Sequence, residues 1–403
     1  MKKILYLFTA EYPYGRAESF LENEVPVLEK HFASIVVFPM VAKTNEKRAT
    51  TNNNFVHPPI NNRPDLNTKK IFRKNVFYLF SVLFAELINS PKPFYFFTHL
   101  RYFNSILMRG IYDSEKIKAL LRDKQENIIF YSYWLNDWAL ALAILKQKGV
   151  IDKFVVRCSG FDIYDERNKG NILPFRYFVY KHTAGVYPNS LDGANYIKNK
   201  KCFSEKVKLH YLGTNDYGLN PFNGSGKFTI VSCSNVIPLK RVDLIVEILK
   251  NITFELNWIH FGDGVCIEEV LKNAQGLPSN ISFDFRGRVP NKEVNEFYKT
   301  HSVNLFITTS ETESLPVSLQ EAISFGIPIV ATNVGGIAEI ANERTGYLID
   351  KDVDVLKIAQ LISDFKKSVK NKIEFRRGVR EFWINNFEAQ RNYSLFCEEI
   401  IKI

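Results

Sequence analysis

Cysteine is scarce in this sequence and is not spaced for cross-linking or metal binding. The 403 residues include five cysteines, and no two of them form a CxxC pair, which argues against a disulfide scaffold and a zinc ribbon. Long apolar runs are also missing. The longest, Val76–Ile88, contains Glu86 and is too short to span a bilayer. The apolar start Ile4–Phe8 is cut off by Glu11 and Pro13, so we expect a buried first strand, not a signal peptide, in a cytosolic protein with reduced thiols.

Acidic residues are under-represented in the first half of the chain. Residues 1–216 contain 32 Lys and Arg against 20 Asp and Glu, a balance of +12, while residues 217–403 contain 21 against 23, a balance of −2. The overall composition, 46% hydrophobic and 24% charged, is that of a globular protein and excludes disorder. The uneven charge predicts two domains with different partners, of which the first faces something anionic.

Apolar segments alternate between strand and helix patterns along the chain. Strand Ile4–Phe8, helix Phe20–Phe32 and strand Ile35–Pro39 form a βαβ unit, which requires a parallel sheet. Turn residues between positions 212 and 226 mark a linker, after which the alternation restarts at Phe228–Cys233. We therefore predict an α/β protein of two Rossmann-like, doubly wound domains facing a cleft, residues 1–215 and 216–375, with a helical segment 376–403 that returns to the first domain.

The segment 309–321 carries two carboxylates between a strand and a helix. Pro316 suits the first turn of that helix, and the N–H groups near Ser314 and Leu315 would point out of the helix start, where an anion such as a diphosphate binds well. Glu313 precedes the helix and Glu321 lies about one and a half turns inside it, so both can contact one ligand through its hydroxyl groups. The structural alternative is a first-turn carboxylate and a solvated helix residue.

Lys240 and Arg241 occupy the first strand-to-helix turn of the second domain. Cations at a helix start oppose the helix dipole, so their placement is unfavourable unless an anion joins them. The alternative is an ordinary solvated helix start. A glycine pair follows the next strand, Gly262-Asp263-Gly264, but it lacks the third glycine of a dinucleotide fingerprint.

These residues resemble a known family. The chain is similar to the family 4 retaining glycosyltransferases of GT-B fold, of the bacterial kind that builds surface polysaccharide. The resemblance depends on a Glu-x7-Glu motif, Glu313 to Glu321, followed by Gly326–Thr332. The segments Gly262–Gly264, Gly287–Val289 and Gly335–Ile340 stand in the order that the family shows.

The resemblance implies a retaining, metal-independent glycosyltransferase without a cofactor. The donor would be a nucleotide-sugar, with UDP expected and GDP as the alternative, and the acceptor a lipid-linked or other glycan in the synthesis of lipopolysaccharide, capsule or exopolysaccharide. By this similarity Glu313 would bind the donor sugar, Glu321 the ribose and Lys240 the diphosphate. The implied donor-binding residues are Gly15, Asn235, Lys240, Arg241, Gly262, Val289, Glu313, Ser314, Leu315 and Glu321. The implied catalytic residues are Glu313, Lys240 and Ser159.

Three positions depart from the family pattern. Asn235 stands where the family usually has an arginine. Arg241 stands where the family has a small residue after the lysine, and it is a candidate to supply the missing charge. Ser159 stands where family members often have histidine, before Gly-x-Asp. These departures keep open a catalytically impaired GT-B-like protein that only binds nucleotide-sugars or acts as a scaffold. A glycosidase that uses Glu313 and Glu321 as acid and base is a further alternative, although it leaves Lys240 unexplained.

The stretch Lys69–Arg109 combines basic and aromatic residues. We expect it to lie on the anionic inner leaflet near a lipid-linked acceptor, which would make the protein cytoplasmic and peripheral to the membrane. The alternative is an ordinary helical pair with a solvated basic edge. Nucleic-acid binding has only the charge in its favour, because no nucleic-acid motif is present. Asp350, Asp352 and Asp354 superficially resemble metal ligands, but we expect a helix N-cap there.

Overall fold

The computed structural model describes residues 2–15, 18–44, 46–48, 54–60, 63, 66–121, 127–200, 203–222, 224, 226–352 and 354–403, which form two compact units. The first unit contains the chain up to His210 together with Tyr393–Ile403, and the second is Tyr211–Asn392. The first boundary lies near the expected one after residue 215. The C-terminal segment differs from the expectation, because only its last eleven residues, 393–403, belong to the first unit.

Each unit is built on a six-stranded parallel sheet, as the alternating pattern predicts. The strands of the first unit, in the order β3-β2-β1-β4-β5-β6, are β1 (Ile4–Thr9), β2 (Ser34–Pro39), β3 (Asn54–Val56), β4 (Ile128–Ser132), β5 (Phe154–Cys158) and β6 (Gly185–Pro188). The central strand β1 pairs with β2 from Ile4–Ser34 to Thr9–Pro39 and with β4 from Ile4–Ile128 to Phe8–Ser132. The helices are α1 (Leu21–His31), α2 (Thr68–Asn89), α3 (Pro93–Thr98), α4 (Leu100–Leu120), α5 (Asp137–Gln147), α6 (Arg176–His182) and α7 (Leu191–Asn199).

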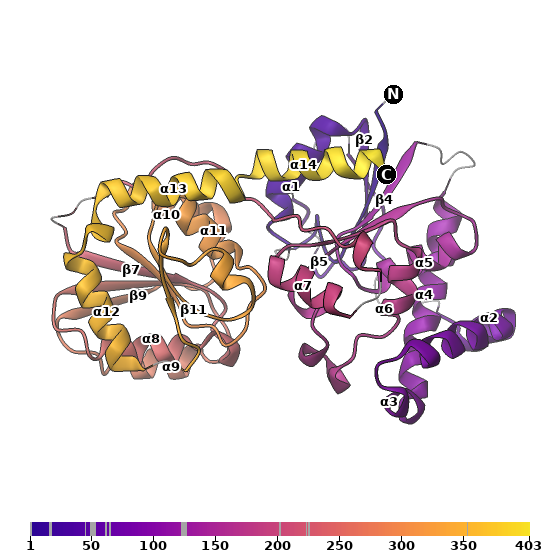
Figure 1. Ribbon diagram of the computed structural model, residues 1–403, viewed down its shortest axis with the longest axis horizontal. Helices are drawn as coiled ribbons and strands as arrows, with labels where there is room; N and C mark the ends of the chain where they lie inside the picture. Colours follow the sequence, from indigo (N-terminus) through magenta and orange to yellow (C-terminus); the bar gives the residue numbers. More distant parts are fainter. Residues whose placement is uncertain are drawn as a thin grey trace. The chain divides into compact units, whose positions relative to one another are not determined.

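Alternating side chains of the central strand divide the core of the first unit into two layers. Leu5 and Leu7 point to the face that is covered by α1 and by the C-terminal helix α14 (Ala389–Lys402). Phe8 points to the other face, where α4 and α5 pack. Helices α2 and α3 lie outside α4 on that second face, as Figure 1 shows.

The second unit repeats the architecture with the strand order β12-β11-β10-β7-β8-β9. Its strands are β7 (Phe228–Cys233), β8 (Leu256–Phe261), β9 (Ile281–Phe285), β10 (Leu305–Thr308), β11 (Ile329–Thr332) and β12 (Gly346–Ile349). Its helices are α8 (Val242–Leu249), α9 (Ile267–Ala274), α10 (Asn291–Thr300), α11 (Val317–Ser324), α12 (Val355–Lys367) and α13 (Ile373–Phe387). One face of the sheet packs on α8, α9 and α12, and the other packs on α10, α11 and α13 (Figure 1).

The acidic cluster near residue 350 is part of a helix start. The Asp354 carboxylate accepts the N–H groups of Leu356 and Lys357 at 3.1 and 3.2 Å, so it caps α12 as expected. No described helix is long and apolar enough to cross a membrane.

Candidate active site

The candidate site of the second unit lies where the strand order reverses. Strand β7 is the first strand of this unit in the chain but lies in the middle of the sheet, between β8 and β10. The chain continues from β7 to β8 on one side and from β10 to β11 on the other, so the loops after these two neighbouring strands lead in opposite directions. In such sheets ligands bind beyond the carboxyl ends of the strands at this point. The two loops contain Lys240 and Glu313, which the sequence singles out.

Lys240 and Glu313 contact each other directly. Lys240 ends a short 3-10 helix, Pro238–Lys240, and its ammonium group forms an ion pair with Glu313 Oε1. The same carboxylate oxygen accepts the Ser310 hydroxyl at 2.8 Å. Both charged side chains are mostly covered, with 20% and 13% of their surface exposed, so water screens their attraction only partly. The chain thus places a paired cation and anion at the switch point of the sheet.

Arg241 contacts backbone groups that the sequence does not predict. Its backbone is left-handed, with φ of 47°, and its guanidinium donates to the carbonyl oxygens of Thr309 at 2.7 Å and Lys351 at 3.0 Å. In return the Thr309 hydroxyl donates to the Arg241 carbonyl at 2.7 Å. Arg241 therefore fastens the β7 loop to the β10 loop, and its part in diphosphate binding stays a prediction.

A second arginine, Arg288, lies beside Asn235. In the sequence, Asn235 is the residue that stands where the resembling family usually has an arginine. Arg288 Nη2 donates to Asn235 Oδ1 at 3.0 Å, and both residues are exposed. The sequence reasoning used the Gly287–Val289 segment only for its backbone and missed this guanidinium. A signal was available, because Arg288 follows β9, and the carboxyl ends of parallel strands meet at one edge of a sheet.

Glu321 is buried inside α11 and is an unusual acid. Asn291 at the start of α10 donates to its Oε1 at 2.7 Å, and Asn295 in turn donates to Asn291 at 2.7 Å. Burial raises the pKa of Glu321 to about 7, and the hydrogen bond from Asn291 only partly offsets this. Burial also raises the pKa of the Cys233 thiol to about 12, with Glu321 raising it further and Lys240 lowering it. The charges of Glu321 and Lys240 therefore both lie close enough to the end of β7 to affect the Cys233 thiol.

Two glycines let backbones approach each other around these side chains. A Cβ at Gly262 would lie 1.8 Å from the Ser234 carbonyl oxygen, and one at Gly335, where φ is +53°, would lie 2.0 Å from the Glu313 carbonyl oxygen. No larger residue fits either position without moving the loop that it touches. Ser314 and Leu315 are buried just before α11, Pro316 is the N-cap of this helix, and Val289 is half-buried.

The other two implied site residues, Gly15 and Ser159, belong to the first unit. Gly15 follows β1 with φ of +60°, and its N–H donates to the Glu46 carbonyl at 3.2 Å. Ser159 follows β5 and caps the short 3-10 helix Gly160–Asp162, with its N–H donating to the Asp162 carboxylate at 2.6 Å. Burial raises the pKa of Asp162 to about 7. Both residues stand at the carboxyl edge of their sheet, and their contribution to the chemistry stays a prediction.

A carboxylate that the sequence reasoning missed organises the loop after β1. Glu18 accepts the N–H groups of Ala10, Glu11 and Tyr12 at 2.9, 2.7 and 2.7 Å, and the indole N–H of Trp134 at 2.5 Å. Four donors on one carboxylate hold the loop that follows β1 against the loop that follows β4. These are the loops at the switch point of the first sheet.

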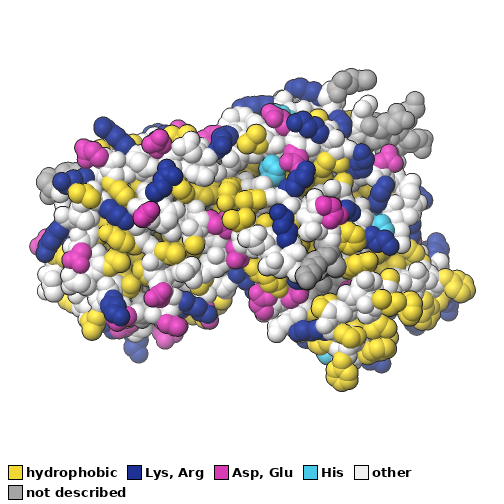
Figure 2. Space-filling model, viewed as in Figure 1, with side chains coloured by type: hydrophobic (Ala, Val, Ile, Leu, Met, Phe, Trp, Pro, Cys, Tyr) yellow, Lys and Arg dark blue, Asp and Glu magenta, His cyan; other side chains and the backbone are white. Residues whose placement is uncertain are grey.

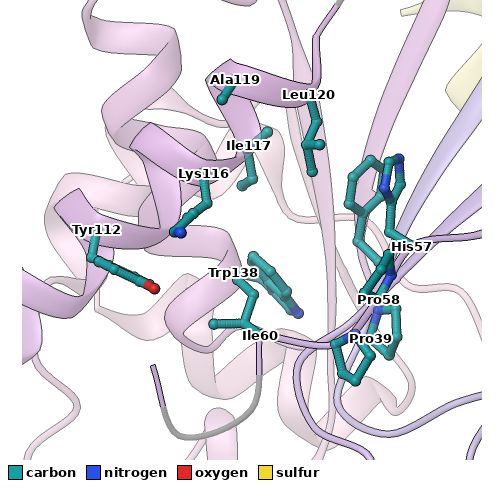
Figure 3. A pocket seen from close by; sticks show the side chains of 12 residues that line it. Pro39, His57, Pro58, Ile60, Tyr112, Lys116, Ile117, Ala119, Leu120 and Trp138 are labelled. Carbon is teal, nitrogen blue, oxygen red and sulfur yellow. The ribbon is translucent and has the colours of Figure 1, made fainter. Parts of the chain in front are cut away.

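An apolar cavity of about 360 Å³ opens at the same edge of the first unit. Figure 3 shows its walls, which come from the ends of β2 and β3, from the last turns of α4 and from Trp138 at the start of α5. The lining includes His57, whose pKa burial lowers, and Lys116, whose ammonium lies 5.3 Å from the centre of the Tyr112 ring. Aromatic walls with a few polar groups are typical of sites for small organic ligands.

Comparisons with known proteins agree with this geometry. The family model described as glycosyl transferases group 1 matches residues 221–381. Sulfoquinovosyl transferase SQD2 from Arabidopsis thaliana is 29% identical over 198 residues, which is 44% of this chain and 38% of that protein. The O-antigen biosynthesis glycosyltransferase WbnH from Escherichia coli is 33% identical over 153 residues, 37% of this chain and 41% of that one. The chain thus matches less than half the length of these curated relatives.

Solved structures extend the likeness to both units. The crystal structure of Anabaena Alr3699/HepE in complex with UDP and glucose aligns over 100% of both chains, with a TM-score of 0.67 and 15% identity. The lipopolysaccharide outer core galactosyltransferase WaaB aligns over 98% of this chain and 99% of that one, with a TM-score of 0.66 and 13% identity. Two Rossmann-like α/β units of this kind define the GT-B fold of glycosyltransferases. Within this fold, residues 221–381 match the model of the glycosyl transferases group 1 family, in agreement with the resemblance of the sequence.

Proposed function

We propose that this protein is a retaining, metal-independent glycosyltransferase that moves a sugar from a UDP-linked donor to a lipid-linked or other glycan acceptor in cell-surface polysaccharide synthesis. The observation that carries the proposal is the Lys240–Glu313 pair, which stands at the switch point of the second sheet inside the family-matched region. The relative WbnH is named for O-antigen biosynthesis, and the structure of HepE contains UDP, which supports this acceptor class and this nucleotide.

The chemistry follows from an exchange of partners at the ion pair. When the donor binds, Lys240 turns from Glu313 to the diphosphate, whose negative charge grows as the sugar leaves. Glu313, released from Lys240, accepts hydrogen bonds from sugar hydroxyls, and Arg288 beside Asn235 supplies a second cation to the nucleotide. Preorganised charges of this kind stabilise the departing group without a metal.

Glu321 is the proposed partner of the ribose. Its carboxylate is held at one oxygen by Asn291 and is costly to ionise in its buried place. Two ribose hydroxyls would compensate the ionised form, so nucleotide binding lowers the pKa of Glu321 and releases a proton near neutral pH. Retention then requires the acceptor hydroxyl to attack from the face that the diphosphate leaves.

The first unit is the proposed acceptor unit, bound at the inner face of the cytoplasmic membrane. The stretch Lys69–Arg109 contains seven Lys and Arg residues and one acid, Glu86, which is buried. A polyprenyl-linked acceptor lies at an anionic surface, and this charge favours the same surface. The aromatic cavity at the carboxyl edge of the first sheet is the proposed acceptor pocket.

A thermal-shift screen of nucleoside diphosphates and nucleotide-sugars tests the proposal. Tight binding of UDP or a UDP-sugar raises the unfolding temperature by mass action, and an excess of EDTA leaves this shift unchanged if no metal is needed. No shift with any nucleotide would contradict the proposal. The alternative, a catalytically impaired protein that only binds nucleotide-sugars, predicts the same rise in unfolding temperature but no release of UDP when a UDP-sugar and lipid-linked acceptors are added.

A further inference from the structure

Helices α2 and α3 of the first unit expose an apolar surface that the fold does not use. Phe77, Phe80, Phe84 and Ile88 recur at spacings of three, four and four residues, which places them on one face of α2. The exposed side chains of Phe94, Phe97 and Leu100 continue the surface along α3 to the start of α4. We call these seven residues the aromatic face.

Packing against the first unit leaves the aromatic face outward. The opposite side of α2 is buried through Leu79 and Val82, which are at most 2% exposed, and through Glu86, which accepts the Phe175 N–H at 2.7 Å. Phe77 and Phe94, in contrast, keep 87% and 81% of their surface. Figure 2 shows the resulting yellow area with basic side chains at its edge.

The size of this surface indicates an interaction site. Large aromatic side chains bury about 150–250 Å² each, so seven large apolar residues exceed the few hundred Å² that a soluble monomer usually exposes in one patch. The water around these rings is released when the face is covered. Burial of apolar surface is favourable in proportion to its area, so even partial cover of several rings gives strong binding.

The charges around the aromatic face select the partner. Lys69, Lys70, Arg73 and Lys74 lie at one end, Lys92 and Arg101 lie at the other, and all six are exposed. A second copy of the chain on this face would bring like charges together across a two-fold axis, because the acid within α2 points inward. An anionic lipid bilayer matches both features of this surface, because its phosphates can pair with the cations and its acyl chains can cover the rings.

We infer that the aromatic face inserts into the hydrocarbon edge of an anionic membrane, with α2 lying along the surface and its cations among the phosphates. The inference rests on the membrane association proposed above and sharpens it. If the rings insert, the protein stays bound to the membrane even at salt concentrations that screen the attraction between its cations and the phosphates. Helices that lie in the interface in this way bury their apolar side about 5–10 Å deep. High salt weakens only the electrostatic part.

Fluorescence quenching by lipids with brominated acyl chains tests the insertion. A Phe80→Trp variant of the full chain is mixed with vesicles of phosphatidylglycerol and phosphatidylcholine, and its quenching is compared with that of the parent. The matched control is Val265→Trp, because Val265 is 86% exposed but lies in the second unit. We expect the added tryptophan to be quenched in the first variant only. Equal quenching in both variants, or none in either, would overturn the inference.

Co-sedimentation with the same vesicles gives the strength of binding. The triple variant Phe77→Ser, Phe80→Ser, Phe84→Ser should lose at least about a hundredfold in vesicle affinity, and the wild type should still bind at about 0.5 M NaCl. The control triple carries Leu356→Ser, Val369→Ser and Ile384→Ser, which replace exposed apolar residues of the second unit and should bind as the wild type does. Binding that salt abolishes would leave only electrostatic attraction and overturn insertion. A wild-type dimer that the first triple converts to a monomer without any vesicle binding would overturn it in favour of self-association.

UDP binding separates this inference from the proposed function. Both triple variants should keep the wild-type thermal shift with UDP, since the substituted residues are surface residues outside the nucleotide site. UDP binding without lipid quenching refutes the insertion alone. Lipid quenching without any nucleotide binding refutes the glycosyltransferase and leaves the insertion standing.

Discussion

Replacing Glu321 with glutamine should stabilise the protein and weaken nucleotide binding at the same time. The pKa of this carboxyl group is raised from 4.5 to about 7, so the folded state holds its proton more tightly than the unfolded state does. Folding stability from this group is therefore complete below pH 4.5 and is lost as the pH rises toward 7. Above pH 7 the buried charge costs about 3 kcal/mol, and Glu321→Gln removes that cost.

Calorimetric unfolding at two pH values measures the effect. We expect the free energy of unfolding of Glu321→Gln to exceed that of the wild type by about 3 kcal/mol near pH 8 and by about 1 kcal/mol near pH 5. The difference is smaller at pH 5 because the carboxyl group keeps its proton in the folded wild type and loses it mainly on unfolding. The control is Glu311→Gln in the loop after β10, where the side chain is half exposed and forms an ion pair with Lys351 at 3.7 Å, so the substitution removes no buried charge. An equal difference at both pH values would refute the reasoning about burial.

The same variant should bind UDP more weakly. An ionised acceptor contributes about 1.5–3 kcal/mol to a hydrogen bond, so loss of the charge weakens binding about tenfold or more near pH 8. The UDP affinity of the wild type should rise between about pH 6 and pH 8 as Glu321 ionises, while that of the variant stays flat. An unchanged affinity in titration calorimetry would remove Glu321 from the ribose site.

Two arginines of the second unit should behave differently under substitution. Arg288→Gln should weaken UDP binding about tenfold in titration calorimetry, because one charged contact to the nucleotide is lost. Arg286→Gln is the matched control, since Arg286 pairs with Asp284 at 2.5 Å and should not respond to UDP. A larger effect of Arg286 than of Arg288 would contradict this assignment. Arg241→Ala should lower stability by about 2 kcal/mol in denaturant unfolding, because the charged donor to the Thr309 and Lys351 carbonyls is lost. Unchanged stability with weaker UDP binding would instead return Arg241 to the diphosphate.

The alternation of strands and helices could be predicted because both sheets are parallel and buried. Segments such as Phe228–Cys233 are buried on both faces and mostly apolar, and the helices that follow keep one apolar stripe, so the two periodicities separate cleanly. The boundary near residue 210 could be found from turn residues alone. The division of the C-terminal segment could not, because α13 and α14 join at residue 388 without a glycine or proline.

The two glutamates of the motif could be found from the sequence because they are close together in it. The direction in which a side chain points could not be found in this way. Glu313 and Glu321 flank one helix start, so local reasoning finds them. Arg241 and Arg288 are placed by contacts with residues 53 or more positions away, and no local pattern tells which of them faces the site. The basic stretch was recognised, but α2 is apolar on nearly every side from Val76 to Ile88, so only the packed structure identifies which phenylalanines remain outside.

Release of UDP from a UDP-sugar by the wild type and by Glu313→Gln tests the central claim most directly. With a lipid-linked acceptor present, the wild type should release UDP, and the variant should lose at least about a hundredfold in rate because the group that holds the sugar is gone. The variant should still bind UDP at least as tightly as the wild type, because Lys240 is no longer paired with Glu313. Release at the wild-type rate by Glu313→Gln, or no release by the wild type with any nucleotide-sugar, would contradict the assignment.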